Sequence, residues 1–429
     1  MSTLNVNVHH VTRVEGHGNI VVDAQNGDIK ECRFEVVEAP RFFEAFVRGR
    51  PYTELNHITS RICGICAVGH STTSAMATEK AMGVELTEQA QLLRKLNFHG
   101  ETIDSHVLHT YYLVAPDFFG AGSVIPLIDV NRAVVERALR IKKLSGDLCA
   151  MIGGRHTHPC ALVVGGFSHT PTEEELRAMR QRLVAAREDM DASVELFASL
   201  DWPQFERETE YVSLTKDDEY AFVGGTIKTT DGFEYPVEEY KSVTNEEMVP
   251  FSSAKWTHHN RESYMVGALA RFNNNFDQLH PRAKDAAAKF GLEPIVTNPF
   301  LNTAAQVVEM VHCVEDGIEI IDELLERGIE PEDPAVADVK AGEGVASCDV
   351  PRGILFHHYA YDEEGFCEDA NCIIPTNQNM ANLNHDMQEL LPRIIDKPQD
   401  EVRLTLEMLV RAYDPCISCS AHFLTVEFV

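Results

Sequence analysis

The sequence predicts a mainly helical α+β fold, in which a central bundle of long helices carries smaller β flaps. Two patterns point to it: long stretches with apolar residues three and four positions apart, and short stretches of alternating polarity bounded by turn residues. In addition, the sequence contains no internal repeat, no low-complexity segment and no flexible linker. We therefore expect residues 1–429 to form a single domain, with a β insertion at about 207–250.

Residues 8–39 open the chain as strands, with a turn at Asn26-Gly27-Asp28, and the pattern becomes helical after Pro51. Thr87 and Thr172 stand where helix N-caps are expected, and Thr172 begins a Thr-Glu-Glu-Glu run that is typical of a helix start. The long helices predicted in this way cover 86–114, 130–154, 172–200 and 302–328, with two more between about 381 and 413, and strands are predicted within 207–250 and 345–376.

The composition is that of a folded protein, with 44% hydrophobic and 24% charged side chains in 429 residues. The formal net charge of -30 argues against nucleic acid or an anionic membrane surface as partners, since both require clustered Lys and Arg. No apolar run approaches the roughly 20 residues of a membrane helix, so we expect no direct membrane span. The N-terminus lacks the order of a signal peptide and the eleven Cys are scattered, so we expect a cytoplasmic protein.

Two Cys-x-x-Cys pairs offer four thiolates: Cys63 with Cys66 in RICGICAVGH, and Cys416 with Cys419 in DPCISCSAH. Such a turn brings two sulfurs to one side, and four thiolates suit zinc, an iron–sulfur cluster or nickel. Structural zinc sites usually place their second pair about 15 to 20 residues away, whereas about 350 residues separate Cys66 from Cys416. The site would therefore join the two ends of the chain, and structural zinc and a functional metal site both remain open.

The sequence contains no complete nucleotide-binding fingerprint. GAGSVI at 120–125 has Ile125 where the dinucleotide fingerprint needs its third Gly, and nothing matches the phosphate-binding GxxxxGK[ST] pattern. If electrons reach a nicotinamide, flavin or deazaflavin, we expect another subunit to hold it.

Six motifs, in the same order along the chain, resemble those of the large, catalytic subunit of nickel–iron hydrogenases. They are VTRVEGHGNI (11–20), RICGICAVGH (61–70), MIGGRHTHPCALVVGG (151–166), DVPRGILFHH (349–358), IIPTNQN (373–379) and DPCISCSAH (414–422). The resemblance implies an enzyme that cleaves H2 reversibly and heterolytically at a buried bimetallic site, where the N- and C-terminal CxxC loops meet. It also implies a small partner subunit with iron–sulfur clusters, because this chain has no further clustered Cys to hold them.

The resemblance assigns a role to each Cys of the two pairs. Cys63 and Cys416 would be terminal nickel ligands, while Cys66 and Cys419 would bridge nickel to an iron that carries carbon monoxide and cyanide. Soft thiolates are suitable ligands for nickel. Glu15 matches the proton-relay carboxylate that is hydrogen-bonded to a terminal cysteine in that family; without the resemblance, it would be interpreted as an ordinary surface carboxylate.

Five further positions match residues that surround the metals in that family. Arg352 matches the arginine over the open metal face, where a guanidinium can order water and contact cyanide, and Asp414 matches its paired carboxylate. Pro351 and Thr376, together with Arg352, lie where the family hydrogen-bonds its cyanides. His70 is expected next to the metal ligands. By residue type alone, Arg352 would belong to an ordinary turn and His70 would be a buried, satisfied histidine.

A second ion site, for Mg2+ or Fe2+, is implied by Glu44, the backbone carbonyl at Cys372, and His422. One carboxylate with a carbonyl and waters suits such a hard cation. Seven residues follow His422, where precursors in this family usually carry an extension that is removed, so this tail is either retained or marks an unprocessed form. The remaining cysteines match no ligand position and are expected to be buried small hydrophobes: Cys32, Cys149, Cys160, Cys313, Cys348 and Cys367.

One departure from the family pattern concerns an Asp that many members carry near the active-site arginine. Ser105 occupies the aligned position, with Asp104 beside it, which indicates the cytoplasmic, cofactor-coupled branch. Further subunits with flavin or iron–sulfur clusters would then pass electrons to NAD(P), deazaflavin, ferredoxin or heterodisulfide. The alternatives are a four-cysteine structural zinc protein and a non-hydrogenase homologue of the respiratory complex I type, whose members have lost the cysteines that are present here.

Overall fold

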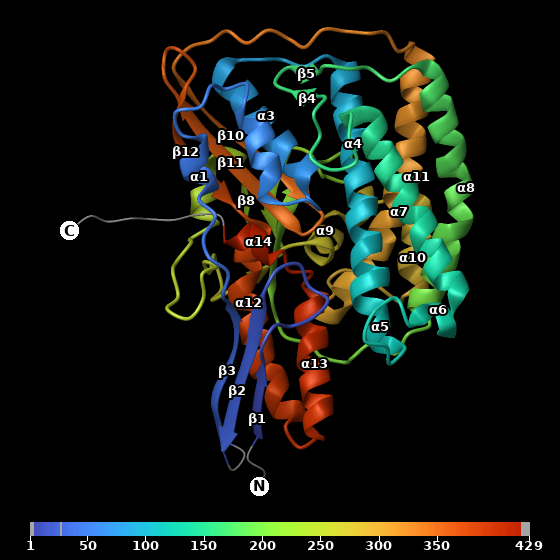
Figure 1. Ribbon diagram of the computed structural model, residues 1–429, viewed down its shortest axis with the longest axis vertical. Coiled ribbons are helices and arrows are strands. Elements are labelled where there is room, and N and C mark those ends of the chain that lie inside the picture. Colours follow the sequence, from blue (N-terminus) through green and yellow to red (C-terminus); the bar gives the residue numbers. More distant parts are fainter. Residues whose placement is uncertain (1–3, 26–27, 422–429) are drawn as a thin grey trace, which may run out of the picture.

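Four long helices form a bundle in the computed structural model, which describes residues 4–25 and 28–421 (Figure 1). In this bundle α11 packs against both α4 and α8, and α4 also packs against α7. The mainly helical α+β prediction is therefore confirmed, while Asn26 and Gly27 of the predicted turn lie outside the described residues. The four helices are α4 (Glu88–Val107), α7 (Arg132–Gly153), α8 (Glu173–Ala198) and α11 (Asn302–Arg327).

The N-caps of α4 and α8 are the ones that the sequence predicts. The Thr87 hydroxyl accepts a hydrogen bond from the backbone N–H of Ala90 at 3.0 Å. Thr172 and Glu175 form a reciprocal capping box, in which each side chain accepts from the other residue's backbone N–H. Local capping chemistry therefore sets where α4 and α8 begin.

The helix predicted over 86–114 is present, but its last part is a π-helix, which the sequence did not indicate. α4 ends at Val107 and continues as the π-helix η2 (Leu108–Val114), followed by α5 (Ala115–Phe118). Single π turns are frequent at functional sites. Here the wider turn carries His109, whose ring nitrogens lie 2.5 Å from Gln306 Oε1 and 2.6 Å from the carbonyl oxygen of Arg411.

The strands form small antiparallel sheets at the edges of the helical body, as expected for β flaps (Figure 1). Three strands of the predicted insertion pair with one later strand in the order β8-β7-β6-β9, and β9 runs parallel to β6. The strands are β1 (Leu4–Val8), β2 (Gly18–Gln25), β3 (Asp28–Val36), β4 (Leu162–Val163), β5 (Gly166–Phe167), β6 (Glu210–Thr215), β7 (Thr226–Thr229), β8 (Glu234–Tyr235), β9 (Tyr264–Met265), β10 (Gly342–Val350), β11 (Gly353–Tyr361) and β12 (Cys367–Ile373).

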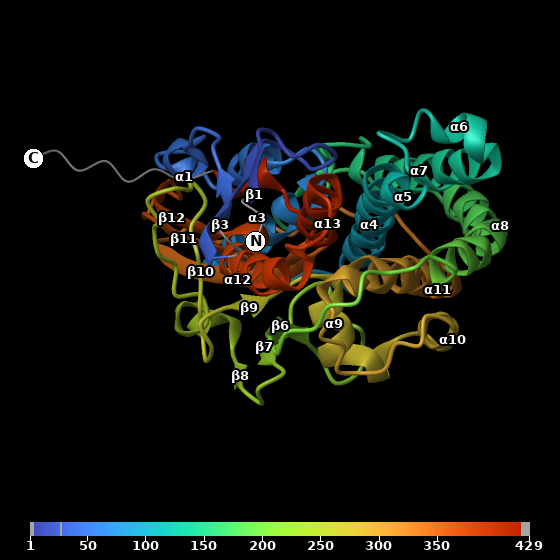
Figure 2. The same cartoon turned by 90° about the horizontal axis from the view of Figure 1, so that it is seen from below.

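The first sheet of the chain and its last helices lie side by side (Figure 2). Seen from below, the sheet β1-β2-β3 lies beside α12 and α13, and β3 contacts α12 while β1 contacts α13 (Figure 2). The backbones of Glu15 and Cys416 form a parallel bridge immediately before α14. The C-terminal helices are α12 (Pro375–Ile394), α13 (Gln399–Ala412) and α14 (Ile417–Ser420).

The other helices are short connections, with the exception of α3. No helix among residues 4–25 and 28–421 is long and apolar enough to cross a membrane. These elements are α1 (Phe43–Val47), α2 (Leu55–Thr59), η1 (Ser60–Ile62), α3 (Ala67–Met82), α6 (Leu127–Val130), η3 (Val237–Ser242), α9 (Ala268–Asn275), η4 (Phe276–Gln278), α10 (Pro281–Lys289) and η5 (Pro299–Leu301).

Helix α3 packs directly on strand β10, and glycines permit the close approach. A Cβ atom on Gly344 would lie 2.1 Å from the carbonyl oxygen of Ala77 and 2.6 Å from the backbone nitrogen of Ala81. Both neighbours are helix backbone and cannot move aside cheaply. A side chain at position 344 would therefore push the sheet away from the helix that follows Cys66.

Gly344→Ala is expected to destabilise the protein by about 1–3 kcal/mol, the usual cost of overpacking a core. Urea unfolding followed by circular dichroism measures the change. Gly122→Ala is the control, because a Cβ atom there meets nothing within 4 Å. Equal unfolding midpoints for the two variants would contradict the close packing of β10 on α3.

Candidate metal centre

The four cysteines of the two CxxC pairs converge on one buried point. Their sulfur atoms all lie within 4.8 Å of one another. Cys63 Sγ is 3.3 Å from Cys416 Sγ, and Cys66 Sγ is 3.6 Å from Cys419 Sγ. None of the four is in a disulfide, and each residue is at most 3% exposed. The structure thus joins the two pairs that the sequence places at opposite ends of the chain.

Backbone and side-chain contacts tie the N-terminal and C-terminal loops around this cluster. The backbone N–H of Ile417 donates to the carbonyl of Glu15 at 3.0 Å. The Arg41 guanidinium donates to the carbonyl of Ile62, directly before the first pair, and to the carbonyl of Ser418, within the second pair. Cys66 is also the N-cap residue of α3, so the positive end of that helix dipole lies near its sulfur.

The ionisation of the thiols shows what the cluster needs in order to hold four thiolates. A hydrogen bond from Cys416 is the main reason why the pKa of the Cys63 thiol lies well below its ordinary value. Burial raises the pKa of Cys416 and of Cys419 well above the ordinary value. The Cys63 thiol therefore ionises readily, whereas burial opposes the ionisation of Cys416 and Cys419. A bound cation would favour the thiolate form of all four cysteines. The donor set therefore fits a soft metal centre.

Glu15 lies against the second pair. Its Oε2 atom accepts hydrogen bonds from Cys416 Sγ at 3.3 Å and from the backbone N–H of Ser418 at 3.0 Å. The neighbouring Arg13 side chain is directed elsewhere, since it donates to the Leu113 carbonyl at 2.6 Å and pairs with Asp117. A carboxylate is thus held within proton-transfer distance of a cluster thiol.

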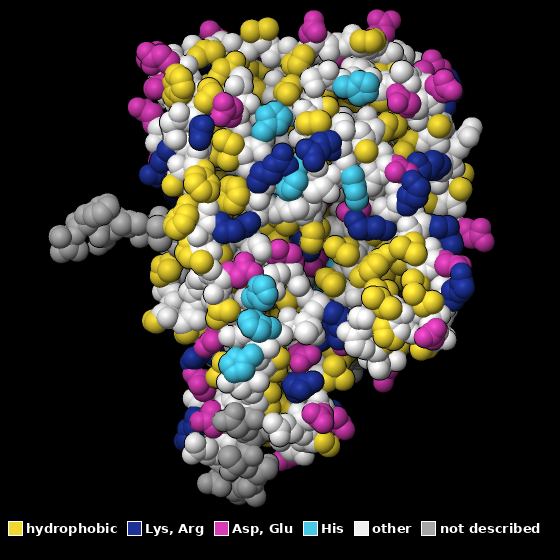
Figure 3. All heavy atoms as spheres, in the orientation of Figure 1, with side chains coloured by type: hydrophobic (Ala, Val, Ile, Leu, Met, Phe, Trp, Pro, Cys, Tyr) yellow, Lys and Arg dark blue, Asp and Glu magenta, His cyan; other side chains and the backbone are white. Residues whose placement is uncertain are grey.

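A polar path next to Glu15 escapes sequence analysis because no motif contains its central residue, Glu38. The Ser418 hydroxyl donates to Glu38 Oε2 at 3.3 Å, and Glu38 Oε1 lies 3.1 Å from His17 Nδ1. The His17 side chain is 64% exposed. Figure 3 shows that histidines gather in a row on this face, above the β1-β2-β3 sheet. Polar side chains therefore lead from the C-terminal loop to the surface.

Arg352 is buried beside the four sulfurs, at the turn between β10 and β11. Its Nε atom donates to Asp414 at both the carbonyl oxygen, 2.9 Å away, and Oδ1, 3.1 Å away. Although burial opposes the charge, Asp414 and the neighbouring cysteines hold the pKa of Arg352 well above its ordinary value. Its Nη1 and Nη2 atoms are buried and form no hydrogen bond of good geometry, although Nη2 lies 3.0 Å from Asp414 Oδ1 in the ion pair. Donors that lack a good hydrogen bond at this place fit acceptor groups on a bound metal.

Thr376 and His70 lie next to cysteines of the cluster, whereas Pro351 contacts another arginine. The Thr376 hydroxyl accepts from the backbone N–H of Cys416 at 3.0 Å, which leaves its O–H to donate. The carbonyl of Pro351 accepts a hydrogen bond from the buried guanidinium of Arg271. His70 Nε2 lies 3.9 Å from Cys419 Sγ, and its Nδ1 lies 3.2 Å from His357 Nε2. His357 has no assigned role in the sequence, although it stands in the DVPRGILFHH motif.

The second predicted ion site is described only in part. Glu44 Oε1 accepts from the backbone N–H of Cys372 at 2.8 Å, so two of its three residues lie together. His422 lies outside the described residues.

Of the six cysteines without a ligand position, five are buried as expected. The prediction is wrong for Cys160, which is exposed in a loop just after the Gly153-Gly154 end of α7.

The departure at Ser105 has a structural counterpart. The Ser105 hydroxyl is buried with no hydrogen-bond partner. Asp104 does not replace the missing charge at the cluster, because its carboxylate is held by Lys142 at 2.6 Å and by Ser145 at 3.0 Å. The described residues therefore leave Asp414 as the carboxylate that pairs with Arg352.

A buried four-thiol centre, flanked by a carboxylate and a guanidinium, fits a metalloenzyme in which charged side chains surround the metal. The chain belongs to the nickel-dependent hydrogenase family, whose pattern it matches over residues 41–133 and 209–422; residues 5–39 match the pattern described as HoxL-like. It is thus the catalytic large subunit of a hydrogenase with a nickel–iron centre, as the motifs predicted.

Relatives and a solved structure are similar to this chain over most of its length. The alpha chain of sulfhydrogenase 1 from Pyrococcus furiosus is 35% identical over 424 residues, 98% of each chain. A component of the vhu F420-non-reducing hydrogenase of Methanocaldococcus jannaschii is 32% identical, covering 89% of this chain and 97% of that protein. The crystal structure of an NAD+-reducing [NiFe]-hydrogenase in the H2-reduced state superposes with a TM-score of 0.88 and 26% identity, covering 98% of this chain and 100% of that one.

Proposed function

We propose that this subunit catalyses reversible heterolytic cleavage of H2 with the four cysteines as its metal ligands. The observation that carries the proposal is the convergence of four buried thiols beside a carboxylate and a guanidinium whose Nη atoms form no good hydrogen bond. Cys63 and Cys416 would be the terminal nickel ligands, and Cys66 and Cys419 the bridges to iron. When bound, the nickel–iron centre supplies the site at which H2 is polarised and split.

The side chains around the cluster supply proton transfer and orientation. Glu15 would accept the proton from the Cys416 sulfur, 3.3 Å away, as a general base. Arg352 would present its Nη donors to cyanide on iron, with the Thr376 hydroxyl as a second donor and Pro351 placing the turn. Asp414 would hold the guanidinium in place, and His70 would orient the Cys419 thiolate.

Electrons would leave through a small partner subunit with iron–sulfur clusters. The support is the position of the cluster just below the surface: Gly64 and Arg61 are exposed, although Cys63 is only 3% exposed. Further subunits with flavin or iron–sulfur clusters would pass the electrons to NAD(P), deazaflavin, ferredoxin or heterodisulfide. The name of the NAD+-reducing hydrogenase favours such a soluble acceptor, whereas the name of the F420-non-reducing relative speaks against deazaflavin.

Three further points complete the proposal. Glu44, the Cys372 carbonyl and His422 would hold Mg2+ or Fe2+, supported by the contact of Glu44 with the Cys372 backbone. The chain would form one domain, supported by a buried apolar cluster that includes residues from Val6 to Cys419. The location would be the cytoplasm, on the ground of the cysteine usage of the sequence.

Metal analysis of the purified complex tests the proposal. We expect about one nickel per chain, as a closed thiolate site implies, together with infrared bands from iron-bound carbon monoxide and cyanide and with H2-dependent dye reduction. Zinc as the sole metal, without these bands, would exclude the proposed centre. The identity of the subunits that co-purify would decide between the acceptors.

A further inference from the structure

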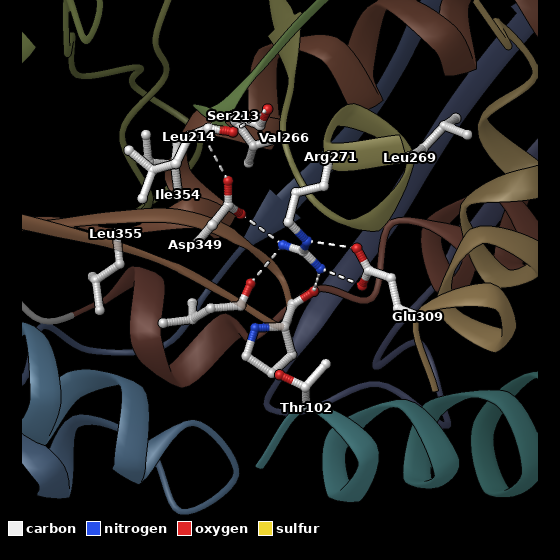
Figure 4. A network of polar contacts seen from close by, with 12 residues as sticks. Thr102, Ser213, Leu214, Val266, Leu269, Arg271, Glu309, Asp349, Ile354 and Leu355 are labelled. Atoms are coloured by element: carbon white, nitrogen blue, oxygen red, sulfur yellow. Dashed lines mark hydrogen bonds and ion pairs between the residues drawn. The ribbon is translucent and has the colours of Figure 1, made fainter. Parts of the chain in front are cut away.

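Arg271, on α9, lies in a buried network of polar contacts beside the turn that carries Arg352 (Figure 4). Its side chain is completely buried, and it makes five hydrogen bonds, which equals the number of N–H donors on a guanidinium. Two of them go to the carboxylate of Glu309 at 2.7 Å each, and one goes to Asp349 Oδ1 at 2.6 Å. The other two go to the carbonyls of Val350 at 2.8 Å and Pro351 at 3.0 Å.

The two backbone contacts are the unusual part of this network. Val350 ends strand β10, and Pro351 is the residue directly before Arg352. A buried cation that only neutralised Glu309 and Asp349 would need no contact with these carbonyls. Arg271 therefore holds the main chain at the point from which the Arg352 side chain starts.

The network is anchored to the helix bundle through Glu309 of α11. Glu309 Oε2 lies 2.7 Å from His106 Nε2 of α4, and Glu309 Oε1 accepts from the Tyr220 hydroxyl at 2.7 Å. Although burial works against its charge, Arg271 holds the pKa of Glu309 at about 2. Glu309 therefore stays ionised at neutral pH, and the ion pair is a permanent part of the fold.

A second residue on the same face of α11 acts on Arg352 through its counter-ion, Asp414. Gln306 stands three residues before Glu309, so both side chains leave the helix in the same direction. The Gln306 amide donates to Asp414 Oδ2 at 3.0 Å, and Asp414 accepts from Arg352. Glu309 thus anchors Arg271, which holds the main chain before Arg352, and Gln306 holds Asp414, the counter-ion of Arg352.

We propose that Arg271 is a positioning residue for the hydrogenase reaction: by holding the carbonyls of Val350 and Pro351, it directs the Arg352 guanidinium at the four-cysteine cluster. This inference rests on the proposed role of Arg352. Arg352 reaches the cluster on a long side chain, so a small tilt of the turn displaces its Nη donors. A misplacement of about 1 Å at an active site can cost on the order of 100-fold in rate.

A second buried arginine provides a matched control. Arg94 of α4 is 2% exposed and makes a two-point ion pair with Glu79 at 2.8 Å for each contact. Its contacts are with a side chain of α3 and not with the turn that carries Arg352. Lysine at either position keeps the charge, but its three donors on one nitrogen cannot reproduce a planar, two-sided contact.

The test compares Arg271→Lys with Arg94→Lys in the complete enzyme complex. We expect both variants to lose thermal stability and to keep their nickel. Arg271→Lys is expected to lower kcat for H2 by about 10- to 100-fold, the usual effect of removing a residue that orients a metal-site group, and to shift the cyanide infrared bands. Arg94→Lys is expected to keep both kcat and the bands. Equal effects of the two variants on kcat and bands would overturn the inference.

A double-mutant cycle with Arg352→Lys shows whether Arg271 acts through Arg352. In the Arg352→Lys background, Arg271→Lys is expected to cause no further loss of kcat, whereas independent, multiplying losses would contradict the proposal. If Arg271→Lys does not fold, Glu309→Gln is expected to lower kcat in the same direction, and an unchanged kcat would overturn the inference. A wild-type complex without H2 turnover would instead count against the proposed function.

Discussion

Cys63→Ser is expected to remove nickel from the protein and to abolish hydrogen turnover. A serine hydroxyl is a harder and far less acidic ligand than a thiol, so it does not replace a thiolate on nickel. Cys63 is also the cluster thiol that ionises most readily, because Cys416 hydrogen-bonds to it. Nickel is measured by mass spectrometry of the purified complex, where the content should fall from about one per chain to near zero.

Cys313→Ser is the matched control for this experiment. Cys313 is a free thiol on α11 that is 1% exposed, and it is not a member of the four-cysteine cluster. The same change there introduces a buried hydroxyl without removing a ligand. A Cys63→Ser protein that keeps its nickel would show that the ligand assignment is wrong.

Glu15→Gln is expected to leave the metal content intact and to lower hydrogen turnover by about 100- to 10,000-fold, the usual contribution of a positioned general base. The amide keeps the shape of the side chain, and it can still accept from Ser418, but it cannot take up a proton from Cys416. Exchange of H2 with deuterated water measures this step directly, without any electron acceptor.

Glu210→Gln serves as the comparison. Glu210 is a fully buried carboxylate on strand β6, outside the cysteine cluster, and it contacts His259. Its variant should exchange hydrogen at the wild-type rate. If Glu15→Gln also exchanges at that rate, protons leave the cluster by another route. Loss of nickel in Glu15→Gln would instead show that this residue supports the fold of the loop.

Local signals predicted the parts of the structure that depend on neighbouring residues. The capping box of Thr172 with Glu175 lies within one turn of chain, and apolar periodicity alone located the long helices. The two CxxC pairs could likewise be recognised from the sequence. If the two pairs form one site, their separation along the chain implies that its distant parts come together, and the four sulfurs do converge.

The parts that escaped prediction depend on contacts between distant segments. Arg271 contacts Glu309 and Asp349, which stand 38 and 78 residues further along, and no motif relates the three. The π turn at Leu108–Val114 and the exposure of Cys160 depend on how whole helices pack and end. Such features are set by tertiary packing, which residue periodicity does not encode.

The convergence of two cysteine pairs from distant parts of the chain also has a consequence for biosynthesis. The ligands are separated by almost the entire chain, so a ribosome must release nearly all of it before Cys416 and Cys419 can join the first pair. Metal delivery to a complete four-thiolate set must therefore follow translation. A metal held by both pairs, as proposed, would cross-link a loop of this length and disfavour the unfolded chain by on the order of 5 kcal/mol, so the cofactor would also stabilise the fold.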